Sequence, residues 1–493
     1  MNILDNFINI ISPEWGCKRA AYREYLRAYE AGEVNRFNDT WLPVNMDTEN
    51  SDKTERELIK ARARYLENNS DMAGAAIGAM VRNVAGTGIR PQARTGSEEL
   101  NNRLEALWRE WVQHDNCDIT HQQGFYELQQ TAIRRKMVDG EILFRIIYDR
   151  KAKIPLKLQM IKSDLLDCNL LYAPKTNNII RSGIELDDHL RPLAYWILRK
   201  SPDGYITYDS ERVPAAQIIH LWQKNHSDQI RGISELAPVV KRLKDTQDYL
   251  DAETVTAKLA ACFSIFITKN LPNGIPGFGN SKDKEGKNLS SIRPGMISYL
   301  RPGEDIKTSN PSRSVTSAKD FIAVQERLAG AGMGISYELM SRDFSGATFS
   351  SARQGHLEDR RTFEPAQQYI IEHFCRPVWA EFVRCCVLKG LVNIPDFSSR
   401  EAIYTAADWV PPGWQWIDPV KEVNADMTAM SAGGLTLAQW CAERGYDWRE
   451  QLEQMAIEKD YAESLGLKLP EHTPESVLAA EANHSAKEAE NEE

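Results

Sequence analysis

The sequence lacks the features that mark membrane-spanning, secreted or disulfide-stabilised proteins. No apolar run approaches the ~18 residues needed to span a bilayer. The apolar N-terminus, MNILDNFINIISPEWG, has neither a leading basic cluster nor a small-residue cleavage site. The eight cysteines are scattered along 493 residues without a C-x-x-C pair, which favours free thiols. These absences predict a cytosolic setting, no signal peptide and no membrane partner.

The sequence also lacks the common catalytic motifs. The nearest candidate for a phosphate-binding loop, Gly279–Lys287 (GNSKDKEGK), spaces its glycines seven residues apart instead of five, and Asn288 stands where Ser or Thr is needed. GAGMG at Gly330–Gly334 follows a helical pattern instead of a strand, so a dinucleotide site is disfavoured. Neither H-E-x-x-H nor G-x-S-x-G occurs. We therefore predict no enzyme, no catalytic residue, no metal and no cofactor, and a mechanical or scaffolding role.

A basic excess is missing as well. The net charge of −10 argues against a dedicated nucleic-acid binder. Residues Glu471–Glu493 hold seven Glu and one Lys, which is −6 of that total. A mildly acidic surface would let DNA pass without gripping it, because phosphate contacts to cations hold DNA in place. Acidic cytosolic proteins are common, however, so charge alone does not decide the function.

Two helical patterns flanking a long Pro/Gly-rich excursion are the most informative feature present. Residues 233–261 place Leu236, Val240, Leu243, Leu250, Ala257 and Ala261 on one helical stripe. Residues Asn270–Arg313 carry the turn sequences NLPNG, IPGFG, IRPG and LRPGED. A second helix is expected from Val315 to Leu328, ending at Gly330, Gly332 and Gly334. Such a long connection inside an ordered region is usually functional or disordered.

The rest of the chain predicts a mixed α+β protein. Helices are expected at 51–84, 98–115 and 122–138, with the punctuation GTGIRPQ at Gly86–Gln92. Strands are expected at 141–148, 156–161, 179–186 and 193–198, with an Asp187–Asp188 turn joining the last two. Further along we expect a polar loop at 341–351, a helix at 352–391 kinked at Pro365 and Pro377, a rigid aromatic turn at 408–418, and helices at 419–432 and 437–464.

The N-terminal residues 15–50 interleave basic residues with tyrosines. This pattern fits a nucleic-acid-binding arm. It also fits an amphipathic arm that packs on its own fold or on a neighbouring subunit, which is the more common occurrence. Both alternatives stay open.

Several segments, taken in order, resemble the portal proteins of tailed double-stranded DNA phages, the lambda-type family. They are GTGIRPQ (86–92), DGEILFRI (139–146), QIRGISELAPVVKRLKDTQDY (229–249), KLAACF (258–263), DFSGATFSSAR (343–353) and GWQWIDPVKE (413–422). The resemblance extends from about Tyr29 to Lys459.

The resemblance implies a ring of identical subunits, usually twelve, around a DNA channel at one capsid vertex. It implies a phage portal fold with a mixed α/β wing, a two-helix stem, a small β-containing clip, a long kinked helix and a helical crown. The parts would be an N-terminal arm (1–50), wing (51–230), first stem helix (231–262), clip (263–312), second stem helix (313–331), tunnel loop (332–352), kinked helix and wing return (353–420), crown (421–470) and acidic disordered tail (471–493).

The same resemblance implies partners and places. The expected partners are other copies of the chain, the terminase large subunit, capsid and scaffold proteins, head-tail connector proteins and DNA bound without sequence specificity. The expected locations are the virion, at the capsid vertex, and the host cytoplasm during assembly. The expected roles are conduit for genome packaging and ejection and docking platform for the terminase.

Two sets of residues are expected to carry these roles. The channel set, in and beside the tunnel loop, is Arg342, Asp343, Ser345, Gly346, Thr348, Ser350 and Arg353. The docking set, in the clip, is Lys282, Lys284, Lys287 and Arg293. Each has a plainer alternative: the loop at 341–351 could be a surface loop with Ser350 or Ser351 as a helix N-cap, and the clip could be a solvated loop without a partner.

Two rival functions also follow from the sequence. An ATP-driven packaging motor subunit is disfavoured because the phosphate-binding loop is missing. A head-assembly adaptor or scaffold protein without a DNA channel remains the alternative.

Overall fold

The computed structural model describes residues 47–261 apart from 175, 177 and 202, residues 265–268 and 297–300, and residues 315–467 apart from 347 and 415–418. The predicted N-terminal arm (1–50, except its last residues), the middle of the clip and the acidic tail lie outside the described residues. The chain divides into two compact units, Met1–Ser51 and Asp52–Glu493. The second unit contains the described strands and all the described helices except the start of α3 (Thr48–Asn69).

The helical pattern expected over 51–84 forms two helices, α3 and α4 (Asp71–Val84). They divide at Ser70, the N-cap of α4, whose hydroxyl oxygen accepts a hydrogen bond from the Ala73 backbone N–H at 3.4 Å. Gly86 follows with a φ of +46°, and a Cβ there would lie 2.9 Å from Pro412 Cβ. The GTGIRPQ segment thus needs glycine because another part of the chain approaches it closely.

Three more helices and a strand precede the sheets. Strand β1 (Arg90–Ala93) leads to α5 (Glu98–Trp111), which buries the predicted face of Leu104, Leu107, Trp108 and Trp111. Short α6 (His114–Cys117) connects α5 to α7 (Phe125–Asp139). Helix α7 ends at Gly140, which has a φ of +86° and forms the left-handed helix terminus that glycine adopts without strain.

Two antiparallel sheets follow. The first has the order β3-β2-β8, from β2 (Glu141–Tyr148), β3 (Leu156–Ile161) and β8 (Ile218–Trp222). The second has the order β4-β5-β6-β7, from β4 (Ile180–Arg181), β5 (Ile184–Leu186), β6 (Pro192–Lys200) and β7 (Ile206–Pro214). The 3₁₀ turns η2 (Ser163–Leu165) and η3 (Ala215–Gln217) lie between the strands.

The strand predictions are confirmed at β2 and β3 with the same bounds. The single strand expected at 179–186 is wrong, because Ser182 and Gly183, with φ of +50° and +86°, turn the chain into the β4–β5 hairpin. Strands β7 and β8 were not predicted. The five residues of β8 are too few to show a period, and the charged β7 is an edge strand, which needs only one apolar face.

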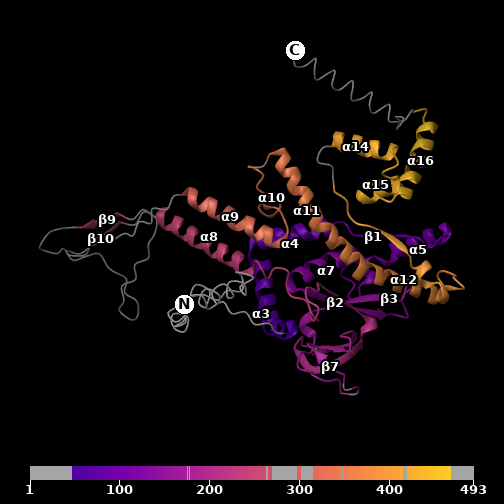
Figure 1. The fold of residues 1–493 in the computed structure, drawn as a ribbon, viewed down its shortest axis with the longest axis horizontal. Helices are drawn as coiled ribbons and strands as arrows, with labels where there is room; N and C mark the ends of the chain where they lie inside the picture. The colour runs from indigo at the N-terminus through magenta and orange to yellow at the C-terminus, as the bar shows by residue number, and fades with distance from the viewer. Residues whose placement is uncertain are drawn as a thin grey trace, which may run out of the picture. The chain divides into compact units, whose positions relative to one another are not determined.

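The helices α8 (Val240–Ala261) and α9 (Val315–Met333) lie side by side (Figure 1). The Arg242 guanidinium donates to Gln325 Oε1 at 2.7 Å, and the rings of Tyr249 and Phe321 are 4.8 Å apart. Between the helices the described residues include β9 (Ile265–Thr268) and β10 (Ile297–Leu300), which pair in parallel.

Both ends of this pair differ from the sequence prediction. The first helix begins at Val240 instead of residue 233, because Pro238 has no backbone N–H to continue the preceding turns into a helix. The second continues through Gly330 and Gly332 to Met333, and the chain leaves it at Gly334, with a φ of +70°. A Cβ on Gly332 would lie 2.6 Å from Val239 Cγ1, so this glycine permits close packing inside the helix.

A long helix with one interruption follows. Helix α10 (Tyr337–Ser341) precedes α11 (Phe349–Ile370), a π-helical turn (Ile371–Cys375) and α12 (Arg376–Leu388). Helix α11 continues across Pro365 to Ile370, so this proline does not end the helix, and the kink expected there stays a prediction. The interruption is the π-helical turn, which ends just before Pro377 in the first turn of α12, where a missing N–H costs little.

The C-terminal elements are η5 (Phe397–Ser399), α13 (Glu401–Tyr404), β11 (Ala407–Val410), α14 (Pro419–Ser431), α15 (Leu437–Glu443) and α16 (Trp448–Ser464). The aromatic turn predicted from residue 408 is wrong at its start, because Asp408–Val410 pair with β1. The helix predicted at 437–464 is divided, since Asp447 caps α16 by accepting from the Arg449 N–H at 2.8 Å.

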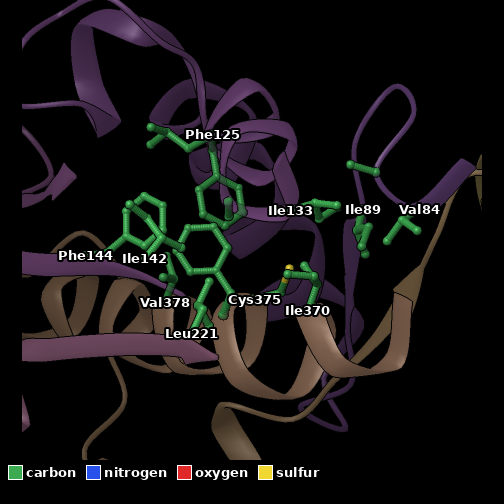
Figure 2. Close-up of a cluster of buried hydrophobic side chains, with 14 of the residues drawn as sticks. Val84, Ile89, Phe125, Ile133, Ile142, Phe144, Leu221, Ile370, Cys375 and Val378 are labelled. Atoms are coloured by element: carbon green, nitrogen blue, oxygen red, sulfur yellow. The ribbon is translucent and has the colours of Figure 1, made fainter. Parts of the chain in front are cut away.

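The main core lies where α7, β2, β8 and the π-helical turn meet. Figure 2 shows Phe125, Phe144, Leu221, Cys375 and Val378 gathered in it. The Phe374 ring stands 5.4 Å from that of Phe125 and 4.5 Å from that of Phe144. A second core cluster, which includes Leu143, Ile184 and Tyr195, joins the two sheets. Side chains as far apart in the sequence as Phe125 and Val378 therefore share one core.

Candidate functional site

The residues predicted to line a channel lie in and beside the loop between α10 and α11. Arg342, Asp343, Ser345 and Gly346 belong to the loop itself, which we call the α10–α11 loop (342–348). Thr348 is the N-cap of α11, and Ser350 and Arg353 lie in its first turns. Arg342, Ser345, Gly346, Thr348 and Ser350 are exposed. The seven residues are close in the sequence, so it is expected that they lie near one another. Their positions in space are determined by α10 and α11, which flank the loop.

The α10 segment is tied to α11 by a buried carboxylate. The backbone N–H and the hydroxyl of Ser336 both donate to Asp359, each at 2.7 Å, and Asp359 is 3% exposed. Thr362 adds a hydrogen bond from its hydroxyl to the Gly334 carbonyl at 2.7 Å. Because Ser336 is also the N-cap of α10, one contact fixes both the start of α10 and its position on α11.

Arg342 ends α10 in a left-handed conformation, with a φ of +56° and its N–H bonded to the Glu338 carbonyl at 2.8 Å. The next residue, Asp343, accepts from the Ser345 N–H at 3.0 Å. Hydrogen bonds from Ser345 lower the pKa of Asp343, so this carboxylate stays ionised at neutral pH. The loop therefore presents neighbouring charges of opposite sign.

A second arginine that the sequence analysis missed lies near Arg342. Burial and, after it, the charge of Arg342 lower the pKa of Arg82 on α4. Helix α10 packs on α4, so Arg342 at the end of α10 lies near Arg82 on α4. The local sequence carries no signal for this, because Arg82 follows a run of small and apolar residues that is typical of a core helix.

The start of α11 differs from the predicted cap. Thr348 is the N-cap, instead of Ser350 or Ser351: its hydroxyl oxygen accepts from the Ser351 N–H at 3.3 Å, and the Ser351 hydroxyl accepts from the Thr348 N–H at 2.9 Å. This is a capping box. Ser350 has no role in it, because the helix begins earlier than predicted. The loop therefore does cap a helix, whatever else it contacts.

Arg353 has a carboxylate near it. Its Nη2 lies 4.0 Å from Glu422 Oε1 on α14, and the Arg353 side chain is 41% exposed. This separation is at the limit of an ion pair, so Arg353 is partly neutralised instead of standing as an isolated cation.

A buried ion-pair network near the root of α8 was also missed. Arg231 and Glu141 are 1% and 0% exposed, and the guanidinium forms a salt bridge with the carboxylate. His220 lies 3.0 Å from the other carboxylate oxygen of Glu141. Burial alone would raise the pKa of Glu141, but the charges and hydrogen bonds of Arg231 and His220 together outweigh it and hold this pKa well below its usual range. Glu141 belongs to the DGEILFRI segment and Arg231 to QIRGISEL, so this contact joins two of the segments on which the family resemblance rests.

Two glycines make this junction possible. A Cβ on Gly140 would lie 2.3 Å from the Ile233 carbonyl carbon, and one on Gly232 would lie 2.1 Å from the Gly140 carbonyl oxygen. The two backbones therefore touch, and any side chain would separate them.

The docking set Lys282, Lys284, Lys287 and Arg293 lies outside the described residues, so its prediction is untested. Within the described parts of the chain, no group of His, Cys, Asp and Glu side chains could hold a metal ion, and no helix there is long and apolar enough to cross a membrane. Burial raises the pKa of the thiols of Cys117, Cys385 and Cys386 to about 12, which leaves them protonated.

The chain is similar to known phage proteins along most of its length. It is 26% identical over 460 residues to the probable portal protein of Halomonas phage phiHAP-1, covering 90% of this chain and 88% of that protein. It is 22% identical over 452 residues to portal protein B of Escherichia phage lambda, covering 83% and 85%.

A chain in the neck of an empty gene transfer agent particle aligns with a TM-score of 0.42 and 14% identity, covering 78% of this chain and 93% of that one, a similarity too low to carry any property across. Residues 35–367 match the family described as phage portal protein, lambda family. The match covers more than half of the sequence. This chain belongs to the lambda family of phage portal proteins.

Proposed function

We propose that copies of this chain form a closed, twelve-membered ring at the unique vertex of a phage capsid. The ring serves as the conduit through which the genome is packaged and ejected. It assembles in the host cytoplasm and contacts capsid, scaffold and head-tail connector proteins. We also propose that the chain divides into the portal parts named above, from the N-terminal arm (1–50) to the acidic tail (471–493). Members of the family are structural proteins, and we propose no catalytic activity.

The observation that carries the proposal is the exposed apolar surface of the α8–α9 pair. Val255 on α8 is 54% exposed, and on α9 Phe321, Val324 and Leu328 are 43%, 46% and 47% exposed. An isolated pair of helices cannot bury such side chains, whereas neighbouring copies arranged by rotation can. Helix α8, with 22 residues, is about 33 Å long at ~1.5 Å per residue, enough for a tall channel wall.

Electron microscopy and native mass spectrometry of the purified protein test this proposal. We expect a ring with an axial hole and a mass near 672 kDa, twelve times the 56.0 kDa of one chain. A monomer at every salt and protein concentration would overturn the ring. A closed assembly without a hole would favour the alternative, an adaptor or scaffold without a DNA channel.

The α10–α11 loop is proposed to face the channel. Its exposed small side chains and paired charges suit weak contacts with passing phosphates, because each firm cationic contact adds grip. The double variant Asp343→Lys/Ser345→Lys adds three positive charges and should impair packaging or retention of DNA while rings still form. The matched control Ser201→Lys/Asp203→Lys adds the same charge in the β6–β7 turn and should package normally. Equal packaging by both variants would show that the loop does not line the channel.

The clip is proposed to dock the terminase large subunit during packaging and the head-completion proteins afterwards, with Lys282, Lys284, Lys287 and Arg293 as contacts. Its turn-rich, lysine-bearing sequence supports this, since binding residues concentrate on loops carried by a rigid scaffold. Deleting Pro272–Asn288 should leave rings intact and block packaging. Normal packaging by this deletion would show that these residues are a solvated loop without a partner.

A further inference from the structure

A cleft of about 680 Å³ opens between the two sheets, away from the α10–α11 loop. Its walls come from α3, α7, β2, β3, β6 and β7. A volume of this size is comparable to that of ligand sites in proteins. None of the roles proposed above uses it.

The cleft is cationic in an acidic protein. Six cationic and three acidic side chains line it, a net charge of +3, whereas the whole chain carries −10. Several of the cations are already neutralised: Arg64 and Arg135 contact Asp139, and Arg145 contacts Glu211 at 2.8 Å.

Two lysines that line the cleft have no ion-pair partner among the described residues. Lys162 and Lys200 are both exposed, and within the described parts of the chain neither side chain has a hydrogen bond or ion pair. Unpaired cations beside a low-dielectric wall favour a ligand that supplies carboxylates.

The floor of the cleft is apolar. Ile142 and Ile197 are buried there, and Met160 on β3 is 40% exposed. Methionine is flexible and adapts to irregular apolar partners. A ligand that contacts both the apolar floor and the two unpaired lysines therefore carries an apolar side chain between negative charges. This combination is typical of an acidic peptide and does not occur in a sugar-phosphate backbone, which has no apolar group to place on Met160.

We propose that this cleft binds the acidic C-terminal segment, Glu471–Glu493, of a copy of this chain. The segment has a charge of −6 and contains Val477 and Leu478 between Glu475 and Glu481. It thus combines apolar side chains and flanking carboxylates in the order that the cleft requires. A cationic cleft attracts a segment of opposite charge, and the attachment of the segment to the chain raises its local concentration. The proposal does not depend on ring formation.

Site-specific photocrosslinking in the full-length protein tests it. A benzophenone amino acid replaces Leu478, and crosslinked peptides are identified by mass spectrometry after irradiation. We expect crosslinks to the peptides that hold Met160 and Lys162 or Arg199 and Lys200. The yield should fall several-fold between 50 mM and 500 mM salt, because screened charges attract weakly. Mixing isotopically labelled and unlabelled protein shows whether the segment comes from the same copy or another.

Charge reversal provides the control. The double variant Lys162→Glu/Lys200→Glu should reduce crosslinking to the cleft at least threefold, whereas Lys224→Glu, an exposed lysine outside the cleft, should leave it unchanged. Crosslinks that map elsewhere, or an unchanged yield in the double variant, would overturn the proposal. A 20-base-pair DNA duplex that occupies the cleft, with the segment crosslinked outside it, would assign the site to nucleic acid and overturn it equally.

Discussion

The main core buries its apolar side chains within one subunit, whereas the distal half of the α8–α9 pair does not. This distal half consists of the described residues of α8 after Thr246 and of α9 before Ala329. In the main core, Phe125, Phe144 and Phe374 are fully buried, and the Phe374 ring contacts the rings of the other two. Among the residues of the two helices whose burial is described, the last buried one along α8 is Thr246 and the first along α9 is Ala329. Burial therefore decreases outward from the main core along both helices. One region is stabilised by its own contacts, whereas the other leaves apolar side chains for a partner to cover.

The largest effect is expected from breaking the buried ion pair near the root of α8. Arg231→Ala leaves Glu141 charged, buried and without its guanidinium partner, so the free energy of unfolding should fall by about 3–5 kcal/mol. Urea unfolding followed by tryptophan fluorescence measures it. The control Arg109→Ala removes an exposed partner of Glu450 and should cost at most about 1 kcal/mol. Equal losses in the two variants would contradict the assignment of Arg231 as a buried structural cation.

A methyl group at the junction of Gly140 and Gly232 should be the next most damaging change. In Gly140→Ala the backbone keeps a φ of +86° and the new Cβ meets the Ile233 carbonyl carbon. The conformational strain alone costs about 1–3 kcal/mol. Thermal melts should show a lower Tm, while Gly96→Ala, with a φ of +83° and open space around it, should show the strain without the clash. A smaller effect at Gly140 than at Gly96 would exclude the close backbone contact.

The cap of α11 makes a smaller contribution. Thr348→Ala removes the side-chain acceptor for the Ser351 N–H and should reduce stability by about 1 kcal/mol. Thr348→Ser keeps the acceptor and should be close to wild type. The same urea titration distinguishes them, and a loss in both variants would point to packing of the threonine methyl group instead.

An acid titration should reveal a moderate contribution from the second sheet. Hydrogen bonds from Arg212 lower the pKa of Glu185 to about 2 from its usual 4.5. A lowered carboxyl pKa stabilises the folded protein above the unfolded value, and that stability is lost as the pH falls from 4.5 towards 2. In Glu185→Gln the fall in Tm over this range should be shallower than in wild type. Parallel Tm curves would show that Glu185 titrates alike in both states.

The smallest effect on the isolated subunit is expected in the distal half of the α8–α9 pair. Val324→Asp changes a side chain that is 46% exposed, so the free energy of unfolding should change by less than about 0.5 kcal/mol. Assembly should nevertheless shift strongly towards monomer in native mass spectra. Leu388→Asp, on a residue 79% exposed at the end of α12, should leave assembly unchanged. Rings that form normally in the Val324→Asp variant would place the subunit interface elsewhere.

The sequence predicted elements whose own pattern is strong and missed those that other segments determine. Strands β2 and β3 alternate or run apolar over several residues and were predicted with their bounds. Strand β11 was missed because its partner β1 is more than 300 residues away. The π-helical turn has no distinguishing sequence pattern, since its residues, IEHFC, mix apolar and polar side chains as an ordinary amphipathic helix does.

The candidate site shows the same division. The α10–α11 loop was predicted from Gly, Ser and Thr, which favour turns through their own chemistry. The Arg82 neighbourhood and the Glu141–Arg231 pair depend on packing between distant segments, so no local pattern indicates them. Glu141 and Arg231 both lie in segments that carry the family resemblance, but nothing in those segments indicates that the two side chains pair.

The strand order β3-β2-β8 has a consequence for biosynthesis. Strand β2 is central, yet its second neighbour β8 follows only after the whole β4–β7 sheet has been made. Glu141 precedes Arg231 by 90 residues, so on the ribosome, at ~5–20 residues per second, the carboxylate exists for about 5–18 s before its guanidinium is synthesised. Until β8 is complete at Trp222, β2 has at least one open edge. A nascent chain arrested before residue 231 should therefore depend more on chaperones than one arrested after the beginning of α8.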